Sequence, residues 1–579
     1  MKNYLFIAMA ALSLAACAEK MDDDKIPHKG EVTESYISIS LSSSDADTRA
    51  ADGTYQKGEE LERAVKTAYF FFFDAEGNAF PVNVTDGAGV APEGEKNHLQ
   101  AVINPTNGSD MNNVSDIKNV VLLLKNYEGD FPSGIVAVLN WVPTEDQYTL
   151  TDLQDKLVEV RDSDTGFIMS NAVYATSGTP ASAIYATPLT ADNIFTDEAN
   201  AKANPVTIYV ERAAAKVTVT TTGGTTKFDV EKPVTIGSTS TKVYAKVLGW
   251  ELYNDYQNST VLKNIDPAWN NDDLGFTWND SPWFRSYWAD SQTTAFTDNT
   301  FQWEYAAIGE GHETVYGYGI GVAADVTNGT YADKTYTYCG ENTNRPEADR
   351  TKIILKAQLQ KEDETPVELA RWYTTEYLGE EDLITAVANT LKYTLYFKDG
   401  GNYVGLKPGD LKCVAPEYDS DGNITNGAPS TIEPYEVFFQ LSDTGNTKEW
   451  YKKVDGEFIA VADDVITDTG SRTATNAQLA ATVKPAIIYN DGQTYYYIDV
   501  KHLGNSGKDA EYGIVRNHIY SININKISGY GSPVYVPISN IVTPEYPGIG
   551  GGDDEYSFVA AEVRILSWRM VQQGVNVQP

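Results

Sequence analysis

Residues 34–53, ESYISISLSSSDADTRAADG, place a regular β-strand directly before an exposed, cleavable loop. Ile37, Ile39 and Leu41 alternate with serines, and this period of two predicts a strand with one apolar face. The residues that follow are small, polar or acidic, and they surround a single basic residue, Arg49. A trypsin-like protease that cut after Arg49 would separate this strand from the rest of the fold. We therefore interpret the strand as a removable part of the protein.

The N-terminus is predicted to be a targeting segment. Lys2 precedes a short apolar stretch at 4–12, which is too short to span a bilayer. The following LAAC, residues 14–17, looks like a bacterial lipobox. This pattern predicts a signal peptide at 1–16, cleavage before Cys17 and acylation of Cys17. The alternative is an ordinary signal peptide with a chance cysteine.

The composition excludes several classes of protein. The chain has 579 residues, too many for one ordinary domain, and 42% of them are hydrophobic, enough to form packed cores. Its formal net charge of −37 repels nucleic acid and anionic lipid, so neither is expected as a partner of the folded part. Abundant Tyr, Thr, Val and Gly favour strands and turns over helices. We expect a mainly β protein with an exposed, charged surface.

The pattern along the chain predicts two β-sandwich domains, at 50–210 and 211–542. Short alternating strands separated by turn residues recur through both. We place the boundary inside an alternating stretch at 206–219 that runs from one domain into the other. Apolar residues at helical spacing predict short helices at 151–160 and 380–391.

A second detachable strand is predicted at the C-terminus. Residues 543–555 contain proline, a glycine run and acidic residues, which is typical of a flexible linker. The segment 556–579 follows, and its apolar alternation changes phase near the middle, as at a bulge or a crossing between two half-strands. The main apolar positions are Val559, Ala561, Val563, Ile565, Leu566 and Trp568.

The sequence singles out no catalytic, metal or cofactor site, so we do not expect an enzyme. HETVY at 312–316 lacks the second His of a zinc protease motif. His98 and His502 stand in polar, loop-like contexts, and His518 stands at the start of a strand, where a structural role is expected. The acidic stretch 419–423 is interpreted as a hairpin turn, because no downstream glutamate completes a calcium loop.

Two cysteines remain after Cys17. Cys339 and Cys413 are too few for a disulfide framework, and neither lies in a CxxC pair. One bridge between them and two free, buried thiols are both compatible with the sequence.

The two terminal strands together point to polymerisation. Removing 17–49 would leave an apolar groove with unpaired backbone N–H and C=O groups. The tethered strand of a neighbouring subunit, within 556–579, could fill that groove by strand addition. Such head-to-tail use of two different surfaces does not close on itself, so it grows a filament. Burial of five or six large apolar side chains would contribute roughly 10 kcal/mol.

At this point the sequence resembles a known family. It is similar to the major fimbrial subunits, or fimbrillins, of Bacteroidales type V pili, and most similar to the shaft subunits of the short, or minor, fimbriae. The stretches that carry the resemblance are LAAC at 14–17, TRA at 48–50, VERAAAK at 210–216, VRNHIYSI at 515–522 and EVRILSW at 562–568.

The resemblance implies a fold, a maturation route and partners. The fold would be two transthyretin-like β-sandwich domains with a C-terminal donor strand at 556–579. The precursor would be a lipoprotein held in the outer membrane through Cys17, and a trypsin-like protease would cut it between Arg49 and Ala50. Another protease could instead cut elsewhere within 42–53. The expected partners in a cell-surface fimbria that supports adhesion are identical subunits and accessory anchor and tip proteins.

Two alternatives stay open. An anchor or tip protein of a fimbria would share the family fold; an anchor would keep its lipid and N-terminal strand, and a tip would lack the donor strand. A surface glycan-binding lipoprotein would need neither cleavage nor a donor strand. The absence of a recognisable site leaves a hydrolase well behind both.

Overall fold

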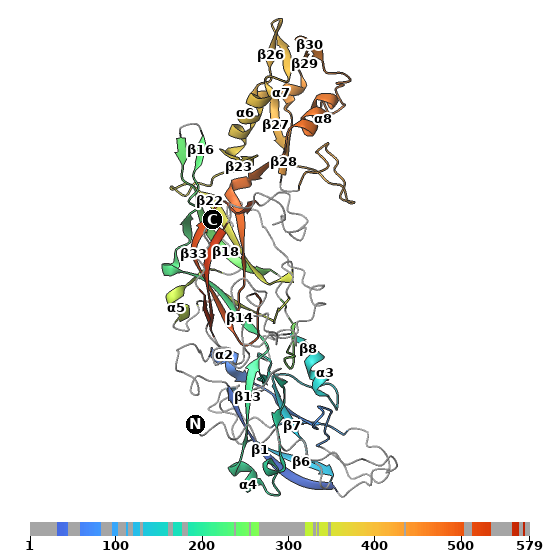
Figure 1. Cartoon of the computed structure of the whole chain (residues 1–579), viewed down its shortest axis with the longest axis vertical. Coiled ribbons are helices and arrows are strands. Elements are labelled where there is room, and N and C mark those ends of the chain that lie inside the picture. Colours follow the sequence, from blue (N-terminus) through green and yellow to red (C-terminus); the bar gives the residue numbers. More distant parts are fainter. Residues whose placement is uncertain are drawn as a thin grey trace.

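The computed structural model shows an elongated, mostly β protein in which three groups of sheets follow one another along the long axis (Figure 1). The structure describes residues 32–43, 58–82, 95–101, 112–113, 120–127, 131–159, 166–175, 183–236, 239–253, 256, 258–265, 319–327, 332, 335–344, 349–433, 436–502, 512–533, 558–566 and 571–573.

Within these residues, the first group is built on an eight-stranded sheet of order β4-β3-β7-β9-β13-β1-β6, with β12 paired to β7. Its strands are β1 (Val32–Ser43), β3 (Ala68–Phe73), β4 (His98–Gln100), β6 (Val120–Tyr127), β7 (Gly134–Leu139), β9 (Met169–Asn171), β12 (Thr187–Pro188) and β13 (Val206–Arg212).

Both faces of this sheet are covered, as the sequence of β3 shows. Phe70 and Phe72 pack on one face in a core that includes Ile37 and Ile39. Phe71 and Phe73 point to the opposite face and pack in a second core with residues such as Tyr148 and Leu153. Because successive side chains of a strand alternate between faces, a run of four phenylalanines can serve two cores at once.

The helix predicted at 151–160 is wrong in its second half. Helix α3 (Leu150–Asp155) begins with Thr149, whose side chain accepts a hydrogen bond from the Asp152 amide. The chain then becomes extended, and β8 (Leu157–Glu159) pairs antiparallel with β19 (Asn258–Thr260). The apolar residues had the spacing of a helix, but pairing with a distant strand determined the backbone conformation.

The second group is a sandwich of two sheets around one core. One sheet has the order β20-β14-β33-β35-β36, with β21 also paired to β14, and the other has the order β15-β18-β22-β32-β34. The largest apolar cluster contains residues from both sheets, among them Val217, Trp250, Leu355 and Ile522. The strands are β14 (Ala215–Thr221), β15 (Lys227–Asp229), β18 (Tyr244–Tyr253), β20 (Gly321–Val322), β21 (Tyr336–Cys339), β22 (Lys352–Gln360), β32 (Gln493–Asp499), β33 (Ile519–Ser528), β34 (Ser532–Pro533), β35 (Phe558–Leu566) and β36 (Val571–Gln573).

The third group lies between β22 and β32 in the sequence and has a core of its own, which includes Leu383, Phe397 and Trp450. It projects from the end of the sandwich that lies away from the first group (Figure 1). Helix α6 confirms the helix predicted at 380–391. The sequence pattern did not distinguish this group from the second. Its elements are β23 (Leu369–Trp372), β24 (Thr375–Leu378), α6 (Gly379–Leu391), β25 (Tyr396–Asp399), β26 (Asn402–Gly405), β27 (Leu411–Val414), β28 (Glu436–Leu441), α7 (Asp443–Asn446), β29 (Trp450–Val454), β30 (Glu457–Ala460), α8 (Thr473–Thr482) and β31 (Ala486–Tyr489).

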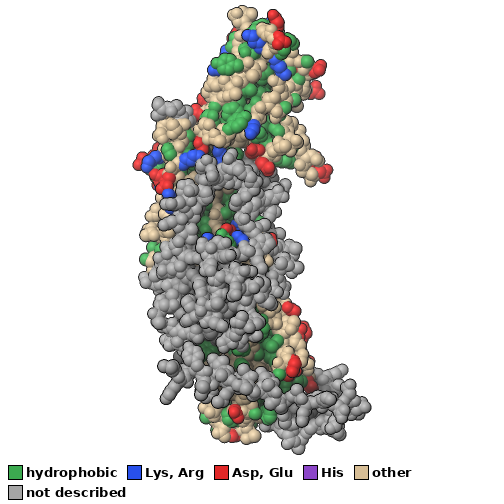
Figure 2. Space-filling view, viewed as in Figure 1, with side chains coloured by type: hydrophobic (Ala, Val, Ile, Leu, Met, Phe, Trp, Pro, Cys, Tyr) green, Lys and Arg blue, Asp and Glu red, His purple; other side chains and the backbone are tan. Residues whose placement is uncertain are grey.

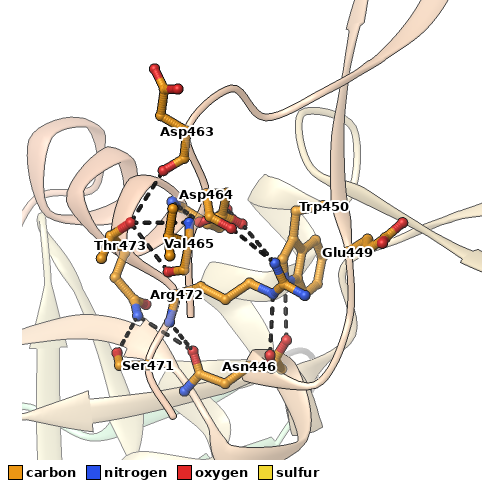
Figure 3. A network of polar contacts seen from close by, with 12 residues as sticks. Asn446, Glu449, Trp450, Asp463, Asp464, Val465, Ser471, Arg472 and Thr473 are labelled. Atoms are coloured by element: carbon orange, nitrogen blue, oxygen red, sulfur yellow. Dashed lines mark hydrogen bonds and ion pairs between the residues drawn. The ribbon is translucent and has the colours of Figure 1, made fainter. Parts of the chain in front are cut away.

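A buried arginine fixes the loop between β30 and α8. The Arg472 Nε donates to the Asn446 carbonyl at 3.1 Å, and its Nη1 donates to the Asp464 carbonyl at 3.1 Å. The Arg472 amide also donates to Asn446 Oδ1 at 2.9 Å. Figure 3 shows the guanidinium lying between these two partners. The network joins the end of α7 to the start of α8 and holds the intervening chain in place.

Short elements complete the described fold. They are α2 (Glu60–Arg63), β2 (Ala64–Val65), β5 (Asn112–Asn113), β10 (Tyr174–Ala175), β11 (Ala183–Ile184), η3 (Ala191–Asn193), α4 (Glu198–Ala203), η4 (Thr222–Gly224), β16 (Val234–Ile236), β17 (Thr239–Thr241), α5 (Ala323–Thr327), η10 (Pro408–Asp410) and η11 (Asn490–Gly492). Among the described residues, no helix is long and apolar enough to cross a membrane.

Candidate functional site: the terminal strands and the junction between sheets

Strand β1, the predicted removable strand, lies inside the first sheet and holds one of its edges in place. Its residues from Val32 to Ile39 pair antiparallel with β6, and its residues from Ile39 to Ser43 pair in parallel with β13. In the strand order, β6 is joined to the rest of the described sheet through β1 alone. Removing β1 would therefore leave both β6 and β13 with unpaired backbone groups.

The apolar face of β1 is buried as the sequence predicts. Ile37 and Ile39 are 0% exposed and pack in the core of the first group. The same core contains Leu122 and Leu124 from β6, together with Ile208 from β13. A slot left by β1 would thus be lined by apolar side chains and edged by two strands. Leu41 pairs with Ile208 in the backbone register, and its side chain lies outside the described set.

Ser38 lies on the other face of β1, and burial of its hydroxyl destabilises the folded strand. Its side chain is fully buried, and among the described residues its hydroxyl has no hydrogen-bond partner. An unsatisfied buried hydroxyl costs about 1–3 kcal/mol. This cost offsets part of the stabilisation from the two isoleucines, so β1 binds its slot less tightly than a fully complementary strand would.

The predicted C-terminal strand is observed as β35, paired with its own chain. It runs antiparallel to β33, from Ser528↔Phe558 to Ile519↔Leu566, with an irregularity between Ile524 and Lys526. On its other side it pairs with β36. Val559, Ala561, Val563, Ile565 and Leu566 all belong to this strand. In this conformation, the strand is held by the second group of the subunit that carries it.

Four predicted features lie outside the described residues. They are the lipidation site Cys17, the cleavage site Arg49–Ala50, the linker 543–555 and Trp568. Of the two remaining cysteines, Cys339 is buried, and Cys413 is a free thiol that is partly buried.

The first described helix after the predicted cut, α2, is bound to the second group by a buried ion pair. Lys216 Nζ on β14 lies 2.8 Å from Glu62 Oε1 and 3.1 Å from Glu59 Oε1. The Tyr338 hydroxyl on β21 donates to the same Glu62 carboxylate. The Arg212 guanidinium donates to the Glu62 carbonyl. These contacts attach the chain just beyond the cleavage loop to both β13 and β14.

The electrostatics of this site keep Glu62 ionised. Burial by itself would raise the pKa of the Glu62 carboxyl. The charges of Lys216 and Arg212, with hydrogen bonds from Lys216 and Tyr338, outweigh burial and hold that pKa below its ordinary value. The same carboxylate, added to burial, raises the pKa of the Tyr338 hydroxyl. The arrangement is a closed ion pair, with its hydrogen-bonding capacity used internally.

A second buried cluster of charged residues is centred on Arg516, which precedes β33. Arg516 is 0% exposed, and its Nε donates to Glu341 Oε2 at 2.6 Å. Its Nη2 donates to the hydroxyls of Ser259 and Thr260. Lys263 lies 3.6 Å from Glu211 at the end of β13 and 3.8 Å from Glu341. The VERAAAK and VRNHIYSI stretches therefore meet at the junction between the first and second groups.

Sequence reasoning missed these charged residues as a site. In β14, Lys216 lies in an alternating stretch that the sequence indicated only as a strand, and all seven residues of that strand are buried. His98 was also misplaced, because it lies in β4 rather than in a polar loop and is 6% exposed, packed against Phe71. His502 is fully buried, with its Nδ1 2.9 Å from the Tyr520 hydroxyl.

The predicted structural and turn residues are otherwise confirmed. His518 is buried at the start of β33, with its Nδ1 2.7 Å from the Arg516 carbonyl. Residues 419–423 form a hairpin turn, in which Asp419 and Asn423 exchange backbone and side-chain hydrogen bonds. No group of three or more potential metal ligands occurs within the described part of the chain.

The C-terminal part of the chain matches a known family. Residues 487–574 match the family described as "Major fimbrial subunit protein type IV, Fimbrillin, C-terminal". The match includes β32, β33, β35 and β36, and hence both the predicted donor strand and the strand that it pairs with. This region of the chain is therefore similar to the C-terminal part of major fimbrial subunits. Among proteins with curated functions, none matches the chain.

Several solved structures are similar over most of the chain at low identity. A fimbrillin of Porphyromonas gingivalis W83 is 12% identical, covers 94% of this chain and 98% of its own, and has a TM-score of 0.33. A protein described as a cell adhesion protein from Parabacteroides distasonis ATCC 8503 is 12% identical, with coverages of 94% and 98% and a TM-score of 0.32. A tip fimbrial protein of P. gingivalis is 9% identical, with coverages of 92% and 99% and a TM-score of 0.26.

Proposed function

We propose that this protein is the shaft subunit of a cell-surface fimbria, and that it polymerises by exchanging one strand for another. The observation that carries the proposal is the position of β1, which among the described strands is the one that pairs with β6 and joins it to the rest of the first sheet. A strand so placed cannot be lost without replacement, because its loss leaves two unpaired strand edges and an apolar slot. Excision of β1 thus creates a binding site for another extended strand.

The slot selects for an apolar, alternating donor. The donor strand must replace two fully buried isoleucines, and burial of each side chain contributes about 1.5–3 kcal/mol of stability. It must also restore antiparallel pairing with β6 and parallel pairing with β13. The segment 556–579 has the required alternation, and β35 within it already exists as a strand. We assign the donor role to this segment of a neighbouring subunit.

The connection to the donor is long enough for exchange between subunits. Residues 534–557 join β34 to β35 and, if fully extended at ~3.3 Å per residue, can reach about 80 Å. In the monomer the donor lies on β33, so polymerisation requires it to leave its own subunit for the slot of the next one. Donor and slot are different surfaces, so each subunit adds to the end of a chain.

Maturation controls the moment at which the slot opens. In this proposal Cys17 is acylated, the precursor travels to the outer membrane as a lipoprotein, and a trypsin-like protease cuts between Arg49 and Ala50. Strand β1 keeps the precursor folded and unpolymerised until that cut. The resulting filament supports adhesion and is completed by accessory anchor and tip proteins.

The experiment that tests the function is determination of the N-terminal residue of protein recovered from the cell surface, with and without an Arg49→Ala substitution. Ala50 is expected in filaments of the wild type. The substituted protein is expected to retain β1 and to stay monomeric. A matched control, Arg63→Ala, alters an arginine in α2 downstream of the cleavage loop and should leave the Ala50 terminus unchanged.

Filaments whose subunits still begin at Cys17 would contradict the proposal. Surface protein that begins at Cys17 and never polymerises would favour an anchor or a glycan-binding lipoprotein instead. Deletion of 556–579 separates the remaining roles, because a shaft subunit then loses the ability to extend the filament, whereas a glycan-binding lipoprotein would keep its binding activity.

A further inference from the structure

The outer face of one sheet in the third group is aromatic where a polar face is expected. The sheet has the order β26-β25-β29-β30, and Phe397 and Trp450 on its inner face are buried in the core. The exposed face of an antiparallel sheet is normally polar. Here the alternate positions form what we term the aromatic face: Tyr396, Lys398, Tyr403, Tyr451, Lys453 and Phe458.

The four rings form one continuous cluster. Tyr403 and Phe458 are stacked, with ring centroids 4.0 Å apart and an interplanar angle of 8°. Tyr396 meets Phe458 edge-on at 4.9 Å, and Tyr451 meets Tyr403 edge-on at 5.0 Å. All four side chains remain partly exposed. Their contacts with one another hold the rings in fixed orientations at the surface.

Two lysine side chains lie beside this aromatic cluster, although the protein as a whole is strongly acidic. Lys398 Nζ lies 5.3 Å from the centroid of Tyr403, and Lys453 Nζ lies 5.4 Å from that of Phe458. One acid on this face, Glu449, accepts a hydrogen bond from the Tyr451 hydroxyl at 3.1 Å. On a chain with a net charge of −37, two ammonium groups beside one carboxylate make this face a local attractor for anions.

The frame behind the aromatic face is rigid. Trp450 donates from Nε1 to the Gly445 carbonyl at 3.0 Å, and Lys448 Nζ lies 3.7 Å from the Phe397 centroid. The Arg472 network holds the chain that follows β30 (Figure 3). Figure 2 shows that this end of the molecule presents hydrophobic, basic and acidic side chains on its surface. Pre-organised groups lose little entropy on binding.

We propose that the aromatic face binds a saccharide that carries a carboxylate. The flat, apolar rings of tyrosine and phenylalanine can pack against the C–H face of a sugar ring, and the tyrosine hydroxyls can hydrogen-bond to the sugar hydroxyls. Lys398 and Lys453 pair with the carboxylate through charge-assisted hydrogen bonds. Nucleic acid, the other common partner of aromatic rings with lysines, carries a charge on every nucleotide, so this acidic chain repels it more strongly than a saccharide that carries a carboxylate only on alternate sugars.

This binding is separate from strand exchange. The third group is inserted between β22 and β32, which pair with each other, whereas the slot of β1 lies in the first group. Saccharide binding can therefore fail while polymerisation stands, and the reverse also holds.

The test is calorimetric titration of the full-length mature chain with a hyaluronan hexasaccharide, which contains glucuronic acid, and with its carboxyl-reduced counterpart. Binding is expected for the acidic form, with at least about tenfold weaker binding of the reduced form. Lys398→Glu combined with Lys453→Glu should weaken binding by about tenfold or more. Phe458→Leu, which keeps an apolar side chain without a ring, should weaken it too. Lys361→Glu, an exposed lysine between β22 and the third group, serves as the control and should bind as the wild type does.

Any of three results would overturn the proposal. They are the absence of wild-type binding to the hexasaccharide, equal binding of the acidic and reduced forms, and unchanged binding by the doubly substituted protein. Because both substituted lysines are exposed, the fold of the variants can be verified by equal thermal unfolding.

Discussion

Lys216 Nζ on β14 lies 2.8 Å from Glu62 Oε1 at α2, with both side chains at most 1% exposed. The pair joins the first described helix beyond the predicted cut to one sheet of the second group. An ion pair removed from water stabilises only when both partners are present and hydrogen-bonded. Here Tyr338 and Glu59 supply the additional contacts.

We expect Lys216→Met to destabilise the protein by about 3–5 kcal/mol, because it leaves the Glu62 carboxylate buried without its cation. Urea unfolding of the cut protein at pH 7 measures the effect. A matched control is Lys242→Met, since Lys242 and Asp229 form a pair whose side chains are 66% and 42% exposed. That change should alter the free energy of unfolding by at most about 1 kcal/mol. Equal effects of the two substitutions would contradict a structural role for the buried pair.

We expect the first group to lose stability as the pH falls from about 6.5 to about 4. Burial, aided by the charge of Lys96, lowers the pKa of His98 to about 4 from its ordinary value of 6.5. The unfolded chain therefore binds a proton over this range that the folded chain does not. The stabilisation that neutral His98 provides is fully present above pH 6.5 and is lost progressively as the pH falls to about 4. The total loss in the free energy of unfolding is about 3 kcal/mol. Denaturant unfolding at pH 7, 5.5 and 4.5 should show this slope, and His98→Gln should flatten it. An unchanged slope in that variant would assign the effect to other groups.

A reversible cross-link should control assembly. Tyr36 on β1 and Leu123 on β6 are directly opposite in the antiparallel register, and Leu123 is 38% exposed. Opposed residues of this kind have the spacing that a disulfide needs. The variant Tyr36→Cys with Leu123→Cys, once oxidised and cut at Arg49, should keep β1 in its slot and stay monomeric. Reduction should restore assembly, as followed by electron microscopy.

The single variant Tyr36→Cys is the control for this experiment and should assemble in either redox state. Filaments formed by the oxidised double variant would show that β1 does not occupy the polymerisation slot.

Strand β6 should be the first element to open when β1 is lost. In the cut protein that lacks 556–579, the β6 (Val120–Tyr127) amides that face β1 lose their strand partner, whereas the Lys125 amide still donates to the Val82 carbonyl at 2.8 Å and is excluded from the comparison. We expect their hydrogen exchange to be at least about tenfold faster than in the uncut precursor. Amides of β22, in the middle of the second group, should exchange at equal rates in both forms. Protection of β6 that persists after the cut would mean that β1 remains bound.

Local patterns predicted many of the elements well. The alternation at 37–41, the phenylalanine run at 68–73 and the helical spacing at 380–391 each encode a backbone conformation within a few residues. Local pattern failed at 157–159, where apolar residues at helical spacing form a strand because a distant partner, β19, pairs with them. It also failed at His98 and His502, which stood in polar, loop-like contexts and are buried.

The sequence alone determined that each end of the chain carries a strand with an apolar face, because alternation along a strand is a local property. It also determined the mainly β class and the resemblance to fimbrillins. Tertiary structure decided which strands those ends pair with, namely β6 and β13 for β1 and β33 for β35. It decided too that Lys216 meets Glu62, since their burial depends on residues far away in the chain. Pairing and burial are cooperative properties of the whole fold, and no local pattern contains them.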